Sequence, residues 1–346
     1  MDLRLLVAAG ALAGCLAAAS AKARDVAVAM RENGAGILVR DALDEIAFEP
    51  FVAAAANPVS VVAWSGGLDA VKAHAADWDV VALSAQEVQP GCDQGLFEKL
   101  DWNALGGRDR YTGLGSSDCG VGAFATATVL AWDRDKFPNA PTWSDFWDVA
   151  KFPGKRGLRK SPEGSLEIAL LADGVAPRDI YGTLGSNDGV ARAFRKLDQL
   201  KPYLVFWSST DEAIRILGSG DVLMTSASNS AVVTANRDHH RNFGTQWAGN
   251  LTAVDAWAVI KGGPDTATAM KLLVFLGDPK LQSRYPAAAG FGGLAKGAND
   301  GLPPDVAALS PTLPANLDKA VVVDGAFWRD NRAKLAQQFD AWLAAH

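Results

Sequence analysis

Short runs rich in Val, Ala and Trp alternate along the chain with longer segments in which apolar residues recur every three or four positions. Runs of the first kind predict buried β-strands, and segments of the second kind predict amphipathic helices. The strand candidates are 26–30, 58–64, 78–84, 121–132, 221–226 and 255–260. Strands that alternate with helices in this way are typical of an α/β protein.

Two helical segments have a clear apolar stripe, one directly after the first strand candidate and one near the end of the sequence. Their members are Val39, Leu43, Ile46 and Ala47 in the first, and Trp328, Leu335, Phe339 and Trp342 in the second. Large apolar side chains that share a helix face usually pack into a core. We therefore interpret the aromatic residues on these faces as core residues and not as ligand contacts.

One strand candidate is interrupted by a charge, because Asp255 lies at the centre of LTAVDAWAVI. A buried carboxylate loses several kcal/mol of hydration, so it needs a cation, hydrogen-bond donors or a wet cleft as compensation. Two interpretations of Asp255 follow. It contacts a ligand in a cleft, or it caps a turn or bonds the backbone of its own domain.

Composition narrows the class of protein. A length of 346 residues exceeds what one hydrophobic core usually serves, so two domains are expected. The chain is 49% hydrophobic and 21% charged, as is ordinary for a globular protein. Its formal net charge of -6 provides no basic surface for nucleic acid or for an anionic membrane, so we expect neither as a partner.

The first residues have the pattern of an export signal. Arg4 precedes a long apolar run, and Ala21, Lys22 and Ala23 provide a small-residue cleavage site. We predict cleavage after about Ala23 and a periplasmic mature protein. An alternative is lipid anchoring, because Leu12 to Cys15 resembles a lipoprotein processing box that would acylate Cys15.

Cys92 and Cys119 are the cysteines that remain after the signal. An even pair in an oxidising compartment predicts a disulfide. The chain has four scattered histidines, and with two cysteines they offer too few ligands for a metal site. We interpret His239 and His240 as part of a solvated loop, and we expect no metal and no cofactor.

Catalytic motifs are scarce. The sequence contains no G-x-S-x-G motif, and its glycine-dense segments GLGSSDCGVG and GFGGLAKG miss the dinucleotide and phosphate-loop patterns. We therefore predict that the protein is not an enzyme, with an exported enzyme as a remote alternative.

Several segments resemble the polyamine-type (spermidine/putrescine) periplasmic solute-binding proteins of ABC importers, within extracellular solute-binding protein family 1. These segments are GCDQGLFEKLDW, SSDCGVG, PTWSDFWDVAKFPGKRGLRK, EIALLADGVAPRDIY, GSGDVLMTSASN and VDAWAVIKGG. They occur in the family's order and cover nearly the whole mature chain. The block DFWDVAKFPGKRGLRK is the most specific of them.

The resemblance implies an α/β, two-lobed periplasmic-binding-protein fold of type II. Each lobe would have a mixed sheet flanked by helices, and the ligand would bind in a cleft at the hinge, which closes around it. After the signal at 1–23, lobe one would comprise 24–122 plus 252–346, and lobe two would comprise 123–251. The disulfide would then lie within lobe one. The implied partners are a small-molecule ligand and an inner-membrane ABC permease, and the protein would be a monomer.

The resemblance also implies a set of ligand contacts. It places Asp255 where the family has an aspartate that meets an amine of the ligand. The full set of expected contacts is Asp255, Glu32, Asn33, Ser84, Gln86, Glu163, Trp207, Ser228, Asn229 and Phe291.

This sequence departs from the polyamine pattern at several of those positions. Ser228, Asn229 and Ser230 stand where the family often has Trp-Asn-Gly, and Gln86 and Glu87 replace an aromatic pair. Smaller and more polar side chains would widen the cleft and remove surfaces selective for ammonium groups. We therefore expect a small amine-containing solute, polyamine-like or amino acid-like, whose carboxylate Arg31 could bind. A bulkier neutral or carboxylate-bearing solute is the alternative.

Overall fold

The computed structural model describes residues 24–31, 36–114 and 116–345. The predicted cleavage site after Ala23, the alternative acylation site Cys15 and the candidate ligand contacts Glu32 and Asn33 lie outside these residues.

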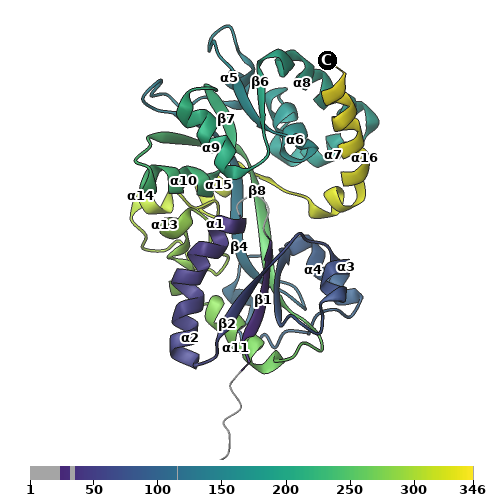
Figure 1. The fold of residues 1–346 in the computed structure, drawn as a ribbon, viewed down its shortest axis with the longest axis vertical. Coiled ribbons are helices and arrows are strands. Elements are labelled where there is room, and N and C mark those ends of the chain that lie inside the picture. Colours follow the sequence, from purple (N-terminus) through teal and green to yellow (C-terminus); the bar gives the residue numbers. More distant parts are fainter. Residues whose placement is uncertain (1–23, 32–35, 115, 346) are drawn as a thin grey trace, which may run out of the picture.

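One mixed β-sheet runs through the molecule. Its strands are β1 (Val26–Arg31), β2 (Val59–Trp64), β3 (Val80–Ser84), β4 (Val121–Asp133), β5 (Arg156–Arg159), β6 (Leu204–Trp207), β7 (Met224–Ser228), β8 (Phe243–Val259) and β9 (Val321–Val322). The order is β2-β1-β3-β8-β4-β7-β5-β6, and β9 pairs with β8. The two longest strands, β4 and β8, are antiparallel neighbours at the centre, and they connect the two halves of the molecule (Figure 1).

The predicted strands agree with β1, β2, β3 and β4 and overlap β7. The prediction for β8 began at residue 255, whereas the strand begins at Phe243. Polar residues and glycine in 244–250 hid this first half, which is strand because it pairs with β4. The four-residue strands β5 and β6 were not predicted, because they are too short to show a period.

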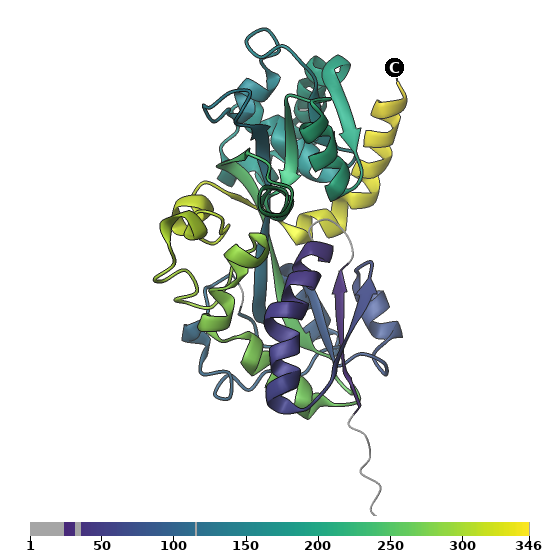
Figure 2. The same cartoon turned by 60° about the vertical axis from the view of Figure 1, so that its left-hand side comes forward.

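Helices cover both faces of the sheet (Figure 2). They are α1 (Gly36–Leu43), α2 (Glu49–Ala55), α3 (Leu68–Ala73), α4 (Ala85–Asp93), α5 (Trp143–Trp147), α6 (Pro162–Ala172), α7 (Ile180–Leu184), α8 (Asn187–Leu200), α9 (Thr210–Ser219), α10 (Asn229–Asp238), α11 (Thr266–Leu276), α12 (Pro279–Gln282), α13 (Tyr285–Ala289), α14 (Pro304–Ala307), α15 (Pro314–Leu317) and α16 (Gly325–Ala344). Within the described ranges, no helix is long and apolar enough to cross a membrane.

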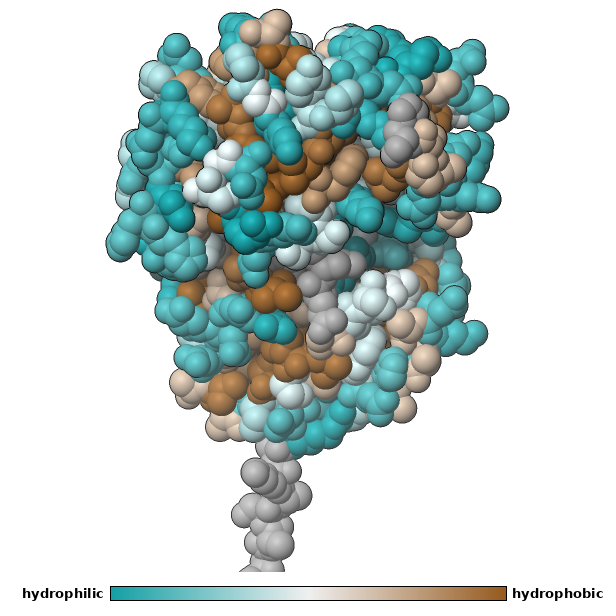
Figure 3. Space-filling view, turned by 45° about the horizontal axis from the view of Figure 1, so that its top comes forward, coloured by the Kyte–Doolittle hydropathy of each residue, from teal (hydrophilic) through white to brown (hydrophobic). Residues whose placement is uncertain are grey.

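Each half of the sheet has its own hydrophobic cores, so the molecule consists of two lobes. In lobe one, Val28 of β1, Val80 of β3 and Trp257 of β8 belong to one buried cluster. In lobe two, Leu158 of β5 and Ile168 of α6 belong to another. Hydrophilic residues cover most of the face drawn in Figure 3, with hydrophobic residues in smaller patches.

The last helix belongs to lobe two, which corrects the expected assignment of all of 252–346 to lobe one. Trp328, Leu335 and Phe339 of α16 lie in the core that α6 and α8 build, and the helix is drawn in yellow on that lobe in Figure 1. The Phe339 ring lies 6.2 Å from that of Phe206 on β6. The apolar stripe was predicted correctly as core, but a stripe does not specify which lobe receives it. The chain therefore crosses between the lobes a third time, just before α16.

The predicted disulfide is confirmed. Cys92 at the end of α4 and Cys119 just before β4 are bonded, with their Cα atoms 5.8 Å apart. Both ends lie in lobe one, so the bond fixes α4 to the loop that leads into the central strand.

Candidate ligand-binding cleft

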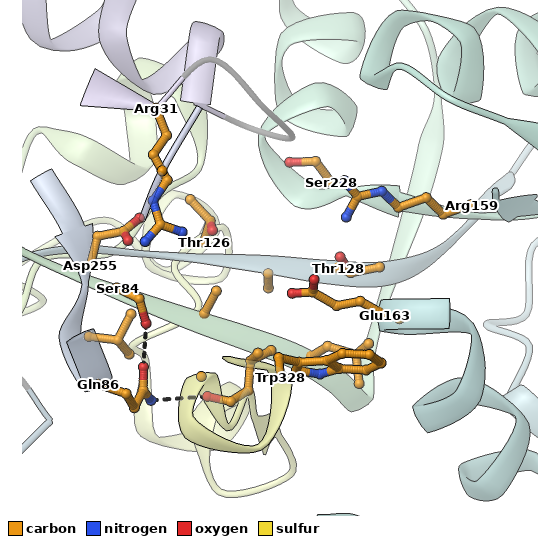
Figure 4. A pocket seen from close by; sticks show the side chains of 18 of the residues that line it. Arg31, Ser84, Gln86, Thr126, Thr128, Arg159, Glu163, Ser228, Asp255 and Trp328 are labelled. Atoms are coloured by element: carbon orange, nitrogen blue, oxygen red, sulfur yellow. Dashed lines mark hydrogen bonds between the residues drawn. The ribbon is translucent and has the colours of Figure 1, made fainter. Parts of the chain in front are cut away.

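A cavity of about 640 Å³ lies over the central strands, and both lobes line it. Its floor is formed by the middle of β4 and β8, including Thr126, Thr128 and Asp255. Figure 4 shows Arg31 and Asp255 on one side of this space, and Arg159 and Ser228 on the other. The carboxyl ends of parallel strands face the cavity, as is usual for ligand sites in open α/β sheets.

In lobe one, the sheet register brings Asp255 to the cavity. Asp255 lies opposite Ser84, the last residue of β3, and opposite Phe124 of β4. Since β1 is parallel to β3, its last residue, Arg31, comes to the same edge of the sheet. An isolated charge in an apolar strand thus faces the space between the lobes.

The carboxyl group of Asp255 has no hydrogen bond or ion pair to any of the described residues. Burial raises its pKa above the ordinary value, the nearby Arg31 opposes this rise, and Glu87 adds to it. Arg31 is itself ion-paired with Glu87, and its guanidinium lies 5.9 Å from the centre of the Trp64 ring. Asp255 is therefore half-buried in the cavity wall and available to a ligand cation.

Ser84 and Gln86 also line the lobe-one side, but their side chains bond to the protein. Ser84 Oγ donates to Gln86 Oε1 at 2.6 Å, and Gln86 Nε2 donates to the backbone oxygen of Val323 at 3.0 Å (Figure 4). Val323 belongs to the third crossing between the lobes. Gln86 thus connects lobe one to the segment that leads into α16.

In lobe two, hydrogen-bond donors converge on the cavity. Arg159 ends β5, Trp207 ends β6, and Ser226 and Ser228 lie at the end of β7. The guanidinium of Arg159 has no hydrogen bond or ion pair to the described residues. The indole nitrogen of Trp207 and the hydroxyl oxygens of Ser226 and Ser228 are buried without a partner there. Helix α10 begins directly after Ser228, so its first backbone N–H groups lie beside them.

Glu163, expected as a ligand contact, lines the cavity but is ion-paired with Arg332 of α16. It lies in a kink at the start of α6, where Gly164 has a φ of +90° that strains other residues. The kink directs the Glu163 carboxylate into the space between β4 and α16 (Figure 4).

A second carboxyl group of α6, Glu167, is fully buried beside the cavity. It accepts hydrogen bonds from Trp328 Nε1 at 2.8 Å, from the Tyr181 hydroxyl at 3.0 Å and from the backbone N–H of Gly164 at 2.8 Å. Burial raises its pKa to about 7, and the charge of Glu163 adds to this rise. The bonds from Trp328 and Tyr181 oppose it.

Two expected contacts do not line the cavity. Asn229 is buried, accepts from the backbone N–H of Ala127 at 2.9 Å and donates to the backbone oxygen of Gly290. Phe291 is buried among aromatic rings, 6.0 Å from Phe124. Both side chains are buried against residues of the central strand β4 and do not reach the cavity.

Sequence reasoning missed several residues of the cavity wall. They are Thr126, Thr128, Arg159, Trp328 and Arg332. Arg159 is the last residue of an unpredicted short strand, and Trp328 and Arg332 belong to a helix expected in the other lobe. Six of the contacts that the resemblance implied do line the cavity: Ser84, Gln86, Glu163, Trp207, Ser228 and Asp255.

Comparison with known proteins identifies the class to which this architecture belongs. The family model described as bacterial extracellular solute-binding protein matches residues 52–315. The chain belongs to this family. As a member, it is the substrate-binding component of an ABC transporter, and its relatives are receptors rather than enzymes.

Individual relatives cover nearly the whole solute-binding protein. The gamma-aminobutyric acid-binding protein of Pseudomonas aeruginosa is 38% identical over 338 residues, which are 96% of this chain and 95% of the relative. An ABC transporter substrate-binding protein from Bradyrhizobium japonicum is 28% identical with a TM-score of 0.78, over 92% of this chain and 99% of that one. A solved GABA receptor is 27% identical, also with a TM-score of 0.78, over 93% and 98%.

The solved relatives confirm the two-lobed periplasmic-binding-protein fold. The expected membership in the extracellular solute-binding proteins is confirmed. The narrower resemblance to the polyamine-binding type is not confirmed, because the curated relative is named for binding gamma-aminobutyric acid.

Proposed function

We propose that this solute-binding protein captures a small linear amino acid whose ammonium and carboxylate lie at opposite ends, of which 4-aminobutyrate is a simple example. The proposal is supported by the relative that is named for binding gamma-aminobutyric acid. The residues Asp255, Arg159, Ser226, Ser228 and Trp207 would form the two ends of the site.

The charges that line the cavity carry this proposal. Four arginines and four carboxyl groups line it: Arg31, Arg159, Arg329, Arg332, Glu87, Glu163, Glu167 and Asp255. Ion pairs join Arg31 to Glu87, Arg332 to Glu163 and Arg329 to Asp330, and Glu167 has its hydrogen bonds. In the described part of the chain, Asp255 and Arg159 alone among these lining charges have no such partner. One unpaired anion in lobe one and one unpaired cation in lobe two complement a zwitterion.

The register of the central strands gives the scale of the site. Asp255 lies opposite Phe124, and Ser228 lies opposite Thr128 four residues further along β4. Four residues of strand span about 13 Å, and β8 and β7 lie on opposite sides of β4, which adds about 10 Å across the strands. The backbones of Asp255 and Ser228 are therefore about 16 Å apart, and side chains extend inward from both ends of this span. The remaining gap suits a solute with a few carbons between its charged groups.

The placement of one unpaired charge in each lobe also suggests how a ligand favours a closed state. Each lobe supplies one of the two unpaired charges, so a solute that carries both charges contacts both lobes at once. A ligand shifts a conformational equilibrium only by its differential contacts, and these contacts form fully when the lobes approach. We propose that a closed monomer then delivers its solute to an inner-membrane permease, and that the mature protein, cleaved after about Ala23, acts in the periplasm.

A polyamine fits these charges less well. Each additional ammonium group requires a further acceptor, whereas Arg159 would face it as a like charge. A second candidate is a bulkier carboxylate-bearing conjugate, since about 640 Å³ exceeds the needs of a four-carbon amino acid. A solved relative that is 25% identical, with a TM-score of 0.76, binds glucopine.

Titration calorimetry tests the proposal with 4-aminobutyrate, butyrate, butylamine and spermidine. We expect 4-aminobutyrate to bind most tightly. Replacement of Arg159 by Gln should weaken its binding about thirty-fold, because a charge-assisted hydrogen bond is lost. The same substitution should leave the weak binding of butylamine unchanged. Arg178→Gln is the control, because Arg178 is exposed and does not line the cavity. Spermidine or butylamine binding as tightly as 4-aminobutyrate would contradict the proposal.

A further inference from the structure

Helix α16 contributes to the cavity although it lies beyond residues 52–315, which the family model matches. Trp328, Arg329 and Arg332 of its first turns line the cavity, together with Val323 and Gly325 just before and at its start. The helix thus has two roles along its length. Its first turns face the ligand space, and Leu335 and Phe339 pack into the core of lobe two.

A single buried side chain, Glu167, joins these first turns to the start of α6. One of its oxygens accepts from both the Trp328 indole and the Tyr181 hydroxyl, and the other accepts from the backbone N–H of Gly164. Three donors from three places in the chain therefore converge on one carboxyl group. Such a group has few alternative arrangements, since each donor would be left buried and unpaired without it.

The same two helices meet a second time through Arg332. Its guanidinium lies 5.7 Å from the centre of the Trp328 ring and forms an ion pair with Glu163, the residue before Gly164. Contacts therefore run in a closed circuit from Glu167 to Trp328, Arg332, Glu163 and Gly164, and back to Glu167. We call this set the α6–α16 wall, and each of its residues except Gly164 places a side chain at the cavity.

We propose that Glu167 is a positioning residue that fixes the α6–α16 wall, and that this wall determines which length of solute fits between Asp255 and Arg159. The inference rests on the proposed function for the chemistry of the two ends. It adds that the length limit is set by a helix outside the matched family region. Arg159 lines the same side of the cavity, so a displaced wall changes the space beside the solute's carboxylate end.

A purely structural anchor would behave differently, and α16 offers a matched example. Near its other end, Trp342 Nε1 donates to the carboxylate of Asp198 at 2.7 Å. This is also an indole-to-carboxylate bond that fastens α16 to lobe two, but neither residue lines the cavity. Trp328→Phe and Trp342→Phe thus remove the same kind of bond from the same helix, at the wall and away from it.

The experiment compares Glu167→Gln, Trp328→Phe and Trp342→Phe by calorimetry with 4-aminobutyrate and 5-aminopentanoate, which differ by one methylene group. In Glu167→Gln, an amide nitrogen can no longer accept from one of the three donors. Glu167→Gln and Trp328→Phe should each change the ratio of the two affinities about fivefold or more, since a well-defined wall discriminates one methylene by about tenfold. Trp342→Phe should lower the melting temperature and leave the ratio unchanged.

A measurement without ligand separates this inference from the proposed function. The indole N–H resonance of Trp328, assigned by its absence in Trp328→Phe, should shift in Glu167→Gln, while that of Trp342 stays in place. If neither amino acid binds the wild type, the proposed function fails and the indole resonance still decides the positioning role. Equal affinity ratios in Trp328→Phe and Trp342→Phe, or an unmoved Trp328 resonance in Glu167→Gln, would overturn the inference.

Discussion

Two carboxyl groups line the same cavity, one in each lobe, and they differ in burial and in what surrounds them: Glu167 is fully buried and Asp255 is half-buried. Glu167 in lobe two receives three hydrogen bonds. Asp255 in lobe one receives none from the described residues, and its nearest cation, Arg31, is already ion-paired with Glu87. Burial raises the pKa of both.

We propose that the difference separates a carboxyl group that organises the protein from one that is left for a ligand. A buried charge without donors is costly, and a protein that retains one gains binding energy when a cation arrives. A buried carboxyl group with three donors contributes its bonds continuously, whether or not a solute is present. Burial alone therefore does not identify a binding residue, and we propose Asp255 as one because its carboxyl group lines the cavity and lacks partners among the described residues.

The largest expected effect is on affinity at Asp255. Asp255→Asn should weaken binding of 4-aminobutyrate by about 2 to 4 kcal/mol, thirty-fold or more, because a charge-assisted bond in a closed cleft is lost. The melting temperature should not fall, since burial disfavours the charge that the substitution removes. Calorimetry and a thermal melt on the same variant measure both. A large drop in melting temperature with unchanged affinity would mean that Asp255 serves its own backbone.

The next effect is the pH dependence of stability at Glu167. Its pKa is raised in the folded state from 4.5 to about 7, so the native state holds this proton more tightly than the unfolded state. The stability that this proton contributes is fully present below pH 4.5 and is lost as pH rises through about 7. The loss corresponds to about 3 kcal/mol.

Urea denaturation between pH 4.5 and 8 measures this effect in wild type and in Glu167→Gln. The variant should lack this part of the pH dependence, whatever constant cost its amide adds. The same slope in both proteins would show that Glu167 stays ionised throughout the range, so that its three donors outweigh its burial.

The smallest expected effect on affinity is at Asn229, which the resemblance implied as a ligand contact but which does not line the cavity. Asn229→Ala should cost about 1 to 2 kcal/mol of unfolding free energy, because the backbone N–H of Ala127 loses its buried acceptor. Affinity for 4-aminobutyrate should change less than twofold, since the side chain does not line the cavity. An affinity loss that matches that of Asp255→Asn would place Asn229 in the site.

Much of the fold was predictable because its signals are local. Buried runs such as VAVAM and WDVVALS have few polar residues, and they are strands β1 and β3. The placement of α16 was not predictable, since Trp328, Leu335 and Phe339 form an apolar stripe that either lobe could bury. The division of a chain between two lobes depends on tertiary packing, which hydrophobic periodicity does not record.

The residues of the candidate site also differ in whether a local sequence signal marks them. Asp255 was conspicuous because a charge interrupted an apolar run, and the register then brought it to the cavity. Arg159 gave no such signal, since an arginine after a basic segment is usual on a surface. Its proposed role rests on the absence of any partner for its guanidinium in the described structure, which a sequence cannot show. Glu163 was expected as a ligand contact, and only the position of α16 reveals that Arg332 already pairs with it.

The pairing of β4 with β8 also indicates where the connection between the two lobes should bend. The ladder between the two strands shifts register between Gly122 and Phe124 and again between Thr128 and Leu130. Such irregularities loosen the ladder locally and increase its twist, so bending should concentrate there. Between these two irregularities, residues 124–128 of β4 stay fully paired with β8 and form the cavity floor. We therefore expect this paired stretch to bend less than the two irregular positions on either side of it. The residence time of a solute should then depend on the elasticity of these two paired strands as well as on the charges that hold the solute.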